Sequence, residues 1–255
     1  MRQPIISVSN VSKVFKGKTL VTAVNDVSFD IMPGEIFGLI GPDGSGKTSM
    51  IQMMTGVADA TEGTIRVAGF DPQTQSDEIK DIIGYMPQGI GLNLYESLSV
   101  EENINFFRDL RQIPTDIFTE NSKKMLHMTR LEPFLSRQAR NLSGGMRQKL
   151  SLICTLVHLP DIIFLDEPTT GVDPRSRQEF WQIIVDLVEV RHVTVIMSTS
   201  YMDEASRCHR VALMHEGKII VQGAPTALKT RLEGKMVRCL AEPQYKALTL
   251  LQKFD

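Results

Sequence analysis

The chain has 255 residues, of which 42% are hydrophobic and 23% are charged, and its formal net charge at pH 7 is −2. This length suits one large domain, or one domain that carries a substantial insert. The charge balance includes no basic excess, which argues against a nucleic-acid partner held mainly by charge.

Cysteine and histidine usage argues against a zinc site and a disulfide framework. The three cysteines (Cys154, Cys208 and Cys239) are far apart, and neither they nor the five histidines show ligand spacing. The N-terminus, MRQPIISVSN, lacks the apolar block of a signal peptide, and no apolar run approaches the roughly 20 residues of a membrane-spanning helix. These features predict a cytoplasmic location.

The first third of the chain has the patterning of strands. IISVSNVSKVF and VTAVNDVSFDI carry β-branched residues with partial alternation, and a polar KGKT turn separates them. A short apolar run, IFGLIG, predicts a buried strand. TSMIQMMTGV then predicts a helix that ends at Gly56, and EGTIRVAGF predicts another strand.

Residues 98–158 have a helical pattern, with three expected helices in VEENINFFRDLRQ, IFTENSKKMLHMTRL and GMRQKLSLICTLVHL. IIFLDEP and VTVIMST predict two later buried strands, each followed by helical sequence. RVALMHEGKIIVQG predicts a hairpin around Glu216 and Gly217. Strands that alternate with helices predict an α/β fold with a largely parallel sheet, on which the central helical block is an insert.

The C-terminal tail, residues 236–255, is expected to lie outside the main domain, which we place at residues 1–235. MVRCLA predicts a strand and EPQYKALTLLQKF a helix. A strand and a helix without further partners suggest either a small additional unit or a linker within a longer protein.

Residues 41–48, GPDGSGKT, fit the pattern GxxxxGK[ST] in full and are here called the phosphate loop. They follow a predicted buried strand and open a predicted helix, which is the context that the pattern requires. The N–H groups of such a loop point at phosphate oxygens, and the helix N-terminus adds positive partial charge. Lys47 can reach the outer phosphates and the Thr48 hydroxyl can ligate Mg²⁺. The alternative is a chance glycine turn.

Two carboxylates end the apolar strand IIFLDE, at residues 162–167. Acids at this position are costly to bury unless they are paired or bound to metal, and ligands bind at this end of parallel strands. We expect Asp166 to contact Mg²⁺, directly or through water, and Glu167 to orient and polarise an attacking water. The alternative is a strand that leaves the core into a polar loop.

A third motif, LSGGMRQK, opens one of the predicted helices. Ser143 can cap this helix, and Gly144 and Gly145 expose backbone N–H groups to an anion. The apolar residues that follow at helical spacing predict core packing.

These motifs, in this order, resemble the nucleotide-binding domain of the ATP-binding cassette (ABC) family, whose signature matches LSGGMRQ. The resemblance runs from about residue 5 to residue 235. It implies a P-loop NTPase (RecA-like) α/β core with an N-terminal antiparallel β subdomain and a helical subdomain inserted at about residues 89–158. It also implies ATP and Mg²⁺ as cofactors, held between the phosphate loop of one cassette and the signature of a second cassette.

The same resemblance implies individual roles. Phe15 in VSKVFKG falls where the family stacks an aromatic ring on adenine, the alternative being a core phenylalanine. Gln88 in GYMPQG matches a glutamine that senses Mg²⁺ and links to the helical insert, and it is expected among the catalytic residues. Asp173 in TGVDP matches an aspartate that passes information across the dimer. The implied nucleotide-binding residues are Phe15, Gly41, Pro42, Asp43, Gly44, Ser45, Gly46, Lys47, Thr48, Ser49, Ser143, Gly144, Gly145 and Asp173; the implied metal ligands are Thr48, Gln88 and Asp166.

One catalytic position departs from the family. In MSTSYMDEA, Ser200 stands where the family has a histidine that grips the γ-phosphate, and a serine hydroxyl is neutral and about 4 Å shorter in reach. His192 cannot take the place of that histidine, because it precedes the strand VTVIM and is separated from Ser200 by roughly six extended residues, or about 20 Å. His209 and His215 are expected in the next helix and strand. Either serine substitutes through a water, or this site binds ATP but turns it over poorly.

YMPQGIGLNLYESLSVEENINFF and LDEPTTGVDPRSRQEFW resemble the first cassette of bacterial tandem multidrug-exporter ATPases, which have a ribosome-associated relative. This likeness implies a second cassette and membrane permease subunits as partners, with the chain peripheral on the inner face of the cell membrane. A soluble ATPase that acts on ribosomes is the alternative, and a purely structural nucleotide-binding module is a third. The near-neutral charge favours the exporter.

Overall fold

The structure is a computed structural model that describes residues 3–17 and 19–231. Its N-terminal part is a three-stranded antiparallel sheet in the order β2-β1-β4, made of β1 (Ile6–Lys16), β2 (Leu20–Ile31) and β4 (Glu62–Val67). Ile6, Val8 and Val11 of β1 are buried, and the partial alternation seen in the sequence follows from this one-sided burial.

A second sheet has six strands in the order β5-β6-β7-β3-β8-β9. Its strands are β3 (Ile36–Ile40), β5 (Ile83–Met86), β6 (Ile162–Asp166), β7 (Thr194–Thr199), β8 (Arg210–His215) and β9 (Lys218–Gly223). All neighbouring pairs are parallel except the hairpin of β8 and β9. The continuous apolar runs of β3 and β6 are explained by complete burial on both faces of the sheet.

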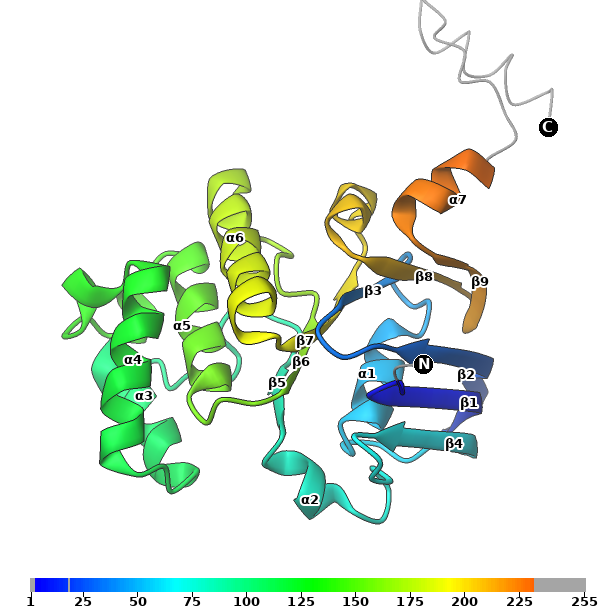
Figure 1. The fold of residues 1–255 in the computed structure, drawn as a ribbon, viewed down its shortest axis with the longest axis horizontal. Helices are drawn as coiled ribbons and strands as arrows, with labels where there is room; N and C mark the ends of the chain where they lie inside the picture. The colour runs from blue at the N-terminus through cyan, green and yellow to red at the C-terminus, as the bar shows by residue number, and fades with distance from the viewer. Residues whose placement is uncertain (1–2, 18, 232–255) are drawn as a thin grey trace, which may run out of the picture.

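The helices are α1 (Lys47–Met54), α2 (Ser76–Lys80), α3 (Val100–Leu110), α4 (Thr115–Thr129), α5 (Gly144–Leu156), α6 (Pro174–Arg191) and α7 (Pro225–Arg231). Short 3-10 segments lie at Glu132–Phe134, Ala139–Asn141 and Met202–Arg207; the last is called η3 below. Figure 1 shows α3, α4 and α5 gathered at one end of the molecule and the three-stranded sheet at the other, with β5, β6 and β7 of the six-stranded sheet between them.

The two faces of the six-stranded sheet pack into different cores. Along β6, Ile163 and Leu165 join the core formed with the helices, whereas Ile162 and Phe164 join the core formed with α1 and the three-stranded sheet. This period of two makes the sheet the middle layer of the molecule. The predicted fold class, a P-loop NTPase α/β core with an antiparallel β subdomain and a helical insert, is confirmed; the exact domain bounds stay a prediction.

The short helices α2 and α7 were not predicted, and two further details differ from the sequence prediction. The four-residue strand β5 was not predicted, because Gly84 interrupts its short apolar run; a Cβ there would lie 2.8 Å from the carbonyl oxygen of Thr155 in α5. The helix expected after β7 is the 3-10 segment η3, so the prediction that His209 lies in a helix is wrong. The predicted strand and helix of residues 236–255 lie outside the described residues.

No helix in the part of the chain that the structure describes is long and apolar enough to cross a bilayer.

Candidate nucleotide site

The phosphate loop connects β3 to α1 as the sequence predicts, and its glycines are required by close backbone contacts. A Cβ on Gly41 would lie 2.1 Å from the carbonyl oxygen of Met214, and one on Gly46 would lie 2.3 Å from that of Ala23. Gly46 also has a φ of 103°, which L side chains rarely adopt. The loop therefore keeps its shape only with glycine at these two positions.

Lys47 is almost fully buried within this loop. Its ammonium group donates hydrogen bonds to the carbonyl oxygens of Gly41 (2.8 Å) and Pro42 (3.0 Å). It also forms an ion pair with Glu167, at 3.2 Å from Oε1, and both side chains are about 5% exposed or less. Lys47 thus holds a compensated positive charge at the place where the loop geometry receives phosphate.

Asp166, the last residue of β6, is fully buried and lies beside the phosphate loop. Its Oδ1 accepts hydrogen bonds from Thr48 Oγ1 (3.1 Å) and Ser198 Oγ (2.5 Å). Burial raises the pKa of Asp166, and the neighbouring Glu167 adds to this rise, whereas hydrogen bonds from Ser198 and Thr48 and the charge of Lys47 oppose it. The ionised form is therefore costly without a further cation.

The same residues fit Mg²⁺. Asp166 Oδ2 is buried without a hydrogen-bond partner, and the Thr48 hydroxyl lies on the other oxygen, so hard oxygen donors converge here. Within residues 3–17 and 19–231, no group of three or more His, Cys, Asp or Glu side chains forms a metal cluster. Mg²⁺ needs no such cluster, since it is usually bound through one or two protein ligands together with phosphate oxygens and water. In this arrangement it would neutralise charge that develops on the phosphates.

Glu167 follows Asp166 and is held from several directions. Gln88 Nε2 (3.1 Å) and Thr170 Oγ1 (3.2 Å) donate to its Oε2, while Lys47 contacts Oε1. Its backbone has a φ of 46°, a strained conformation for a residue with a side chain, of the kind that occurs at functional sites. The carboxylate is thus fixed at the carboxyl end of β6, where a water-orienting base is expected. Gln88 contacts the site through its hydrogen bond to Glu167, and its role as a ligand of Mg²⁺ stays a prediction.

Ser200 follows β7 at the same edge of the sheet and is half-buried. Gly41 is the first residue of the phosphate loop, and its backbone N–H donates to the carbonyl oxygen of Thr199 (3.2 Å). The end of β7 therefore lies against the start of the phosphate loop. No hydrogen bond joins the Ser200 hydroxyl to any residue in the described ranges.

None of the nearby histidines takes the place of Ser200. His192 caps the C-terminus of α6, before β7 begins. His209 accepts a hydrogen bond from the backbone N–H of Ile36 (2.9 Å), at the start of β3, which is the opposite edge of the sheet from the phosphate loop. His215 ends β8 as predicted, and its ring lies 4.0 Å from the Glu216 carboxylate.

The signature residues and Asp173 form a second group. Ser143 caps α5 by accepting a hydrogen bond from the N–H of Met146 (3.3 Å), and Asp173 caps α6 by accepting one from Ser176 (3.0 Å). The bonds from Ser176 hold the pKa of Asp173 below its usual value. A Cβ on Gly145 would lie 2.3 Å from Ser176 Oγ, so the two helix N-termini pack closely. The structure thus places Ser143, Gly145 and Asp173 together.

Phe15 lies on β1 with its ring 43% exposed, and the ammonium group of Lys13 is 4.9 Å from the ring centre. The alternative of a core phenylalanine is therefore wrong, and stacking on adenine stays the prediction for this side chain.

Two polar residues of the site were missed from the sequence. Ser198 bridges the carboxylates, since its hydroxyl donates to Asp166 and accepts from the N–H of Glu167 (2.8 Å). Thr170 holds Glu167. The available signal for Ser198 was a hydroxyl at the carboxyl end of a buried apolar strand, where ligands bind in parallel sheets.

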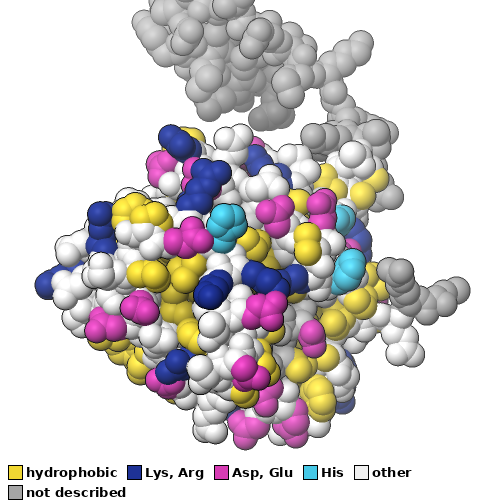
Figure 2. Space-filling view, turned by 60° about the vertical axis from the view of Figure 1, so that its left-hand side comes forward, with side chains coloured by type: hydrophobic (Ala, Val, Ile, Leu, Met, Phe, Trp, Pro, Cys, Tyr) yellow, Lys and Arg dark blue, Asp and Glu magenta, His cyan; other side chains and the backbone are white. Residues whose placement is uncertain are grey.

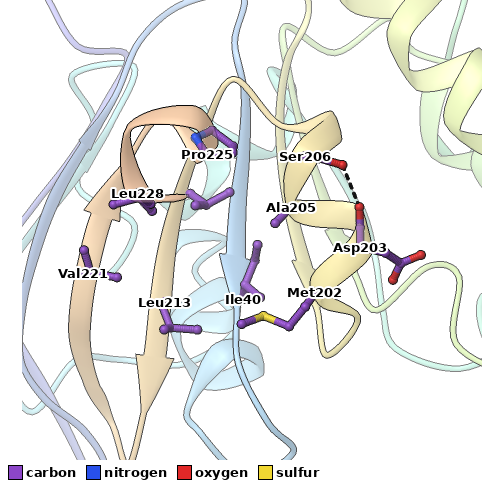
Figure 3. A pocket seen from close by; sticks show the side chains of 10 residues that line it. Ile40, Met202, Asp203, Ala205, Ser206, Leu213, Val221, Pro225 and Leu228 are labelled. Carbon is purple, nitrogen blue, oxygen red and sulfur yellow. Dashed lines mark hydrogen bonds between the residues drawn. The ribbon is translucent and has the colours of Figure 1, made fainter. Parts of the chain in front are cut away.

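A separate cavity of about 430 Å³ lies between η3, β8, β9 and α7 (Figure 3). Its lining is mostly apolar and includes Ile40, Leu213, Val221 and Leu228, with Asp203 and Ser206 of η3 as polar members. No residue of the phosphate loop lines it, so it is distinct from the nucleotide site.

Comparison with known proteins agrees with this geometry. The family model described as "ABC transporter" matches residues 24–170. The chain is 41% identical over 235 residues to the "Probable multidrug ABC transporter ATP-binding protein YbhF" of Escherichia coli (strain K12), covering 92% of this chain but only 40% of YbhF. It is 36% identical to the "Nod factor export ATP-binding protein I" of Paraburkholderia xenovorans (strain LB400), covering 89% of this chain and 73% of that protein.

Solved structures with the same fold are also ATP-binding cassettes. The "post-hydrolysis state of the ATP-binding cassette MJ0796 bound to ADP and Pi", a dimeric structure, matches with a TM-score of 0.76 and 25% identity over 86% of this chain and 98% of that one. The family match covers the phosphate loop and the Asp166–Glu167 pair described above. The chain therefore belongs to the ABC transporter family, as one of its ATP-binding cassettes, which are ATPases.

Proposed function

We propose that this cassette binds MgATP at its own phosphate loop and couples ATP binding and hydrolysis to membrane permease subunits that carry out export. The observation that carries the proposal is the convergence of Lys47, Thr48, Asp166 and Glu167 at one edge of the six-stranded sheet. It supplies a phosphate-binding cation, oxygen ligands for Mg²⁺ and a fixed carboxylate for the attacking water. Export is supported by the names of the relatives, a multidrug transporter protein and a Nod factor export protein.

A second cassette is part of the proposal. Ser143 and Asp173 cap two adjacent helices and neither contacts Lys47 or Asp166, so this group is available to a nucleotide held by another cassette. The dimeric state of MJ0796 supports such an arrangement. The chain spans 40% of the length of YbhF, which leaves room in that relative for a further cassette. We therefore propose a pair of cassettes, each completing the site of the other.

The contact with the permease is expected at the segment that joins β5 to α3. Leu92 and Tyr95 of this segment are 71% and 48% exposed, although both are large and apolar. The segment begins beside Gln88, which binds Glu167, so a partner held there would sense the catalytic carboxylate. The described part of the face in Figure 2 carries intermixed acidic and basic side chains with apolar ones between them, which suits a protein partner better than RNA.

We further propose that turnover at this site is slow because Ser200 replaces a histidine. Glu167 and the magnesium ligands are intact, so the chemistry lacks one donor to the charge on the γ-phosphate. A missing donor of this kind costs about 10²–10³ in rate. The site would hold ATP, while the Ser143 signature would serve a faster site on the partner cassette.

Two measurements test the proposal. Calorimetry of the chain with ATP should show one binding site whose affinity requires Mg²⁺, and an absence of binding would contradict the nucleotide assignment. Purification of the tagged protein from gently solubilised cells should retain permease subunits. Retention of ribosomal subunits instead would contradict export and favour the ribosome-associated alternative.

A further inference from the structure

The segment that follows Ser200 contains a buried carboxylate that the proposed chemistry does not use. Glu204, in η3, is 1% exposed. Its Oε1 accepts two hydrogen bonds, from Thr169 Oγ1 (2.7 Å) and from Trp181 Nε1 (3.1 Å). A carboxylate is costly to bury, and these bonds offset part of that cost. Glu204 therefore joins three separate parts of the chain: η3, the loop after Glu167 and α6.

A second side chain, Arg177 of α6, contacts the same segment. Its guanidinium group lies 4.3 Å from the centre of the Tyr201 ring, 3.9 Å from the Asp203 carboxylate and 4.0 Å from Glu204 Oε1. The backbone N–H of Arg177 donates to the carbonyl oxygen of Asp173 (2.9 Å), so it belongs to the turn that Asp173 begins. The residues that follow Ser200 are thus attached to the helix end that carries Asp173.

The opposite side of η3 is less closely packed. Met202, Asp203, Ala205 and Ser206 line the cavity of about 430 Å³ shown in Figure 3, and Met202 is 63% exposed. The hydrogen bond drawn there, from Ser206 Oγ to the carbonyl oxygen of Asp203 (2.9 Å), lies within η3 itself. On this side η3 borders the cavity, whereas on the Glu204 side it is hydrogen-bonded to the loop after Glu167 and to α6.

We propose that Glu204 is a positioning residue that couples the γ-phosphate site at Ser200 to the loop of residues 168–173. Because one oxygen of Glu204 bonds both Thr169 and Trp181, a displacement of that loop is transmitted to η3, and so to Ser200 four residues earlier. This inference rests on the proposed function, since it requires a nucleotide at the phosphate loop. Glu204 provides a coupling contact within the cassette and takes no part in the chemical step.

The chain provides its own reporter for this contact. Trp181 is the only tryptophan of the 255 residues, and its indole N–H is bonded to Glu204. Fluorescence excited selectively in the indole band, where the four tyrosines do not absorb, therefore comes from the contact in question. A change at the phosphate loop that reaches Glu204 should alter the surroundings of this indole.

The experiment titrates the full 255-residue chain with the Mg²⁺ complex of the nonhydrolysable analogue AMP-PNP and records Trp181 emission alongside calorimetric affinity. We expect the emission to change on binding in the wild-type chain. In Glu204→Ala the change should fall at least about fivefold while affinity stays within about threefold, since the lost contacts lie outside the phosphate loop. Glu204→Gln keeps an acceptor oxygen for both donors and should restore the change.

Glu189→Ala is the matched control, because Glu189 is an exposed carboxylate on α6, the helix that carries Trp181, but lies near its other end; the emission change of this variant should equal that of the wild type. Thr169→Val removes one hydrogen bond with little change of volume, and the same loss of coupling is expected there if Glu204→Ala does not fold. An equal emission change in wild type and Thr169→Val, or a Glu204→Gln protein as deficient as Glu204→Ala, would overturn the coupling role. Failure of the analogue to bind the wild type would instead contradict the proposed function.

Discussion

Lys47 and Glu167 form an almost completely buried ion pair, and this pair explains how both charges are tolerated inside the protein. Phosphate would offer Lys47 a new partner, and Glu167 would remain held by Gln88 and Thr170. At the scale of single residues, the proposed phosphate-binding and water-orienting groups are therefore in direct contact with each other.

Removal of Lys47 should weaken MgATP binding at least tenfold, because a hydrogen bond to a charged group contributes about 1.5–3 kcal/mol. The comparison is best made between Glu167→Gln and the double variant Glu167→Gln with Lys47→Ala, so that no unpaired buried carboxylate complicates the result. Lys124→Ala, which removes a lysine from an exposed ion pair on α4, is the control. Equal calorimetric affinity in all three proteins would contradict the assignment of Lys47.

Asp166 gives a prediction for pH. Its pKa is raised in the folded state, mainly by burial, so the folded chain binds a proton at a pH where the unfolded chain has released it. The stability that this group contributes is therefore present below the ordinary carboxyl pKa and is lost as pH rises through the raised value. Without nucleotide, Asp166→Asn should unfold at a higher temperature than the wild type at pH 8, and this difference should shrink towards pH 4.

The same substitution should have the opposite effect on ligand binding, because it removes a charged ligand for Mg²⁺. Affinity for ATP in Asp166→Asn should no longer depend on Mg²⁺ in calorimetry. A variant that is less stable than the wild type at pH 8, yet keeps Mg²⁺-dependent binding, would contradict both the charge and the metal role of Asp166.

At the scale of elements, the sequence predicted the strands and helices best where burial is simple. β3 and the central residues of β6 and β7 are apolar because both faces of the sheet are covered, and such runs are readable without a structure. β5 has only four residues and contains Gly84, which is there for contact with α5 and weakens the strand pattern. η3 is a 3-10 segment, and its Glu204 is bonded to Thr169 and Trp181, which are distant in sequence; local patterning showed neither feature and predicted a helix there.

The residues of the candidate site were also predicted where they belong to a continuous motif and missed where they do not. The phosphate loop and the Asp166–Glu167 pair are continuous motifs, and the structure brings them together as expected. Ser198 and Thr170 act through single hydroxyl groups that no local motif distinguishes. The role of Ser198 depends on the register of β6 and β7, which pairs Asp166 with Ser198. Thr170 lies three residues after Glu167, and its role depends on the conformation of the loop between them.

Ser143, at the N-terminus of α5, has two proposed roles: it caps the helix, and it faces the nucleotide of the partner cassette. Two substitutions separate these roles. Ser143→Asp and Ser143→Asn both keep a side-chain cap for α5, so both proteins should fold and bind MgATP at their own phosphate loop as the wild type does. Only aspartate places a negative charge where the partner's phosphates are expected. ATPase rates of the paired cassettes should therefore fall strongly in Ser143→Asp and much less in Ser143→Asn; equal rates in the two variants would contradict a signature that faces nucleotide.

At the scale of the whole molecule, the residues divide into a phosphate-binding group at the edge of the sheet and a signature group at the N-termini of α5 and α6. Within the described chain, the contacts of η3 with α6 and with the loop after Glu167 provide one route between the two groups. Such a division suits a protein that works as a pair, since each cassette then supplies both halves of a site. We propose that this cassette holds MgATP but turns it over slowly, because Ser200 does not supply the donor that a histidine would.

The most direct test of that claim is the ATPase rate of Ser200→His against the wild type at saturating MgATP, measured over increasing protein concentration so that pairing is complete. Glu167→Gln gives the rate without a catalytic carboxylate. The account predicts that Ser200→His is about 10²–10³ times faster than the wild type, the usual effect of one donor to developing charge. If the serine and histidine forms turn over equally, at a rate well above that of Glu167→Gln, the missing histidine is not limiting and the account is wrong.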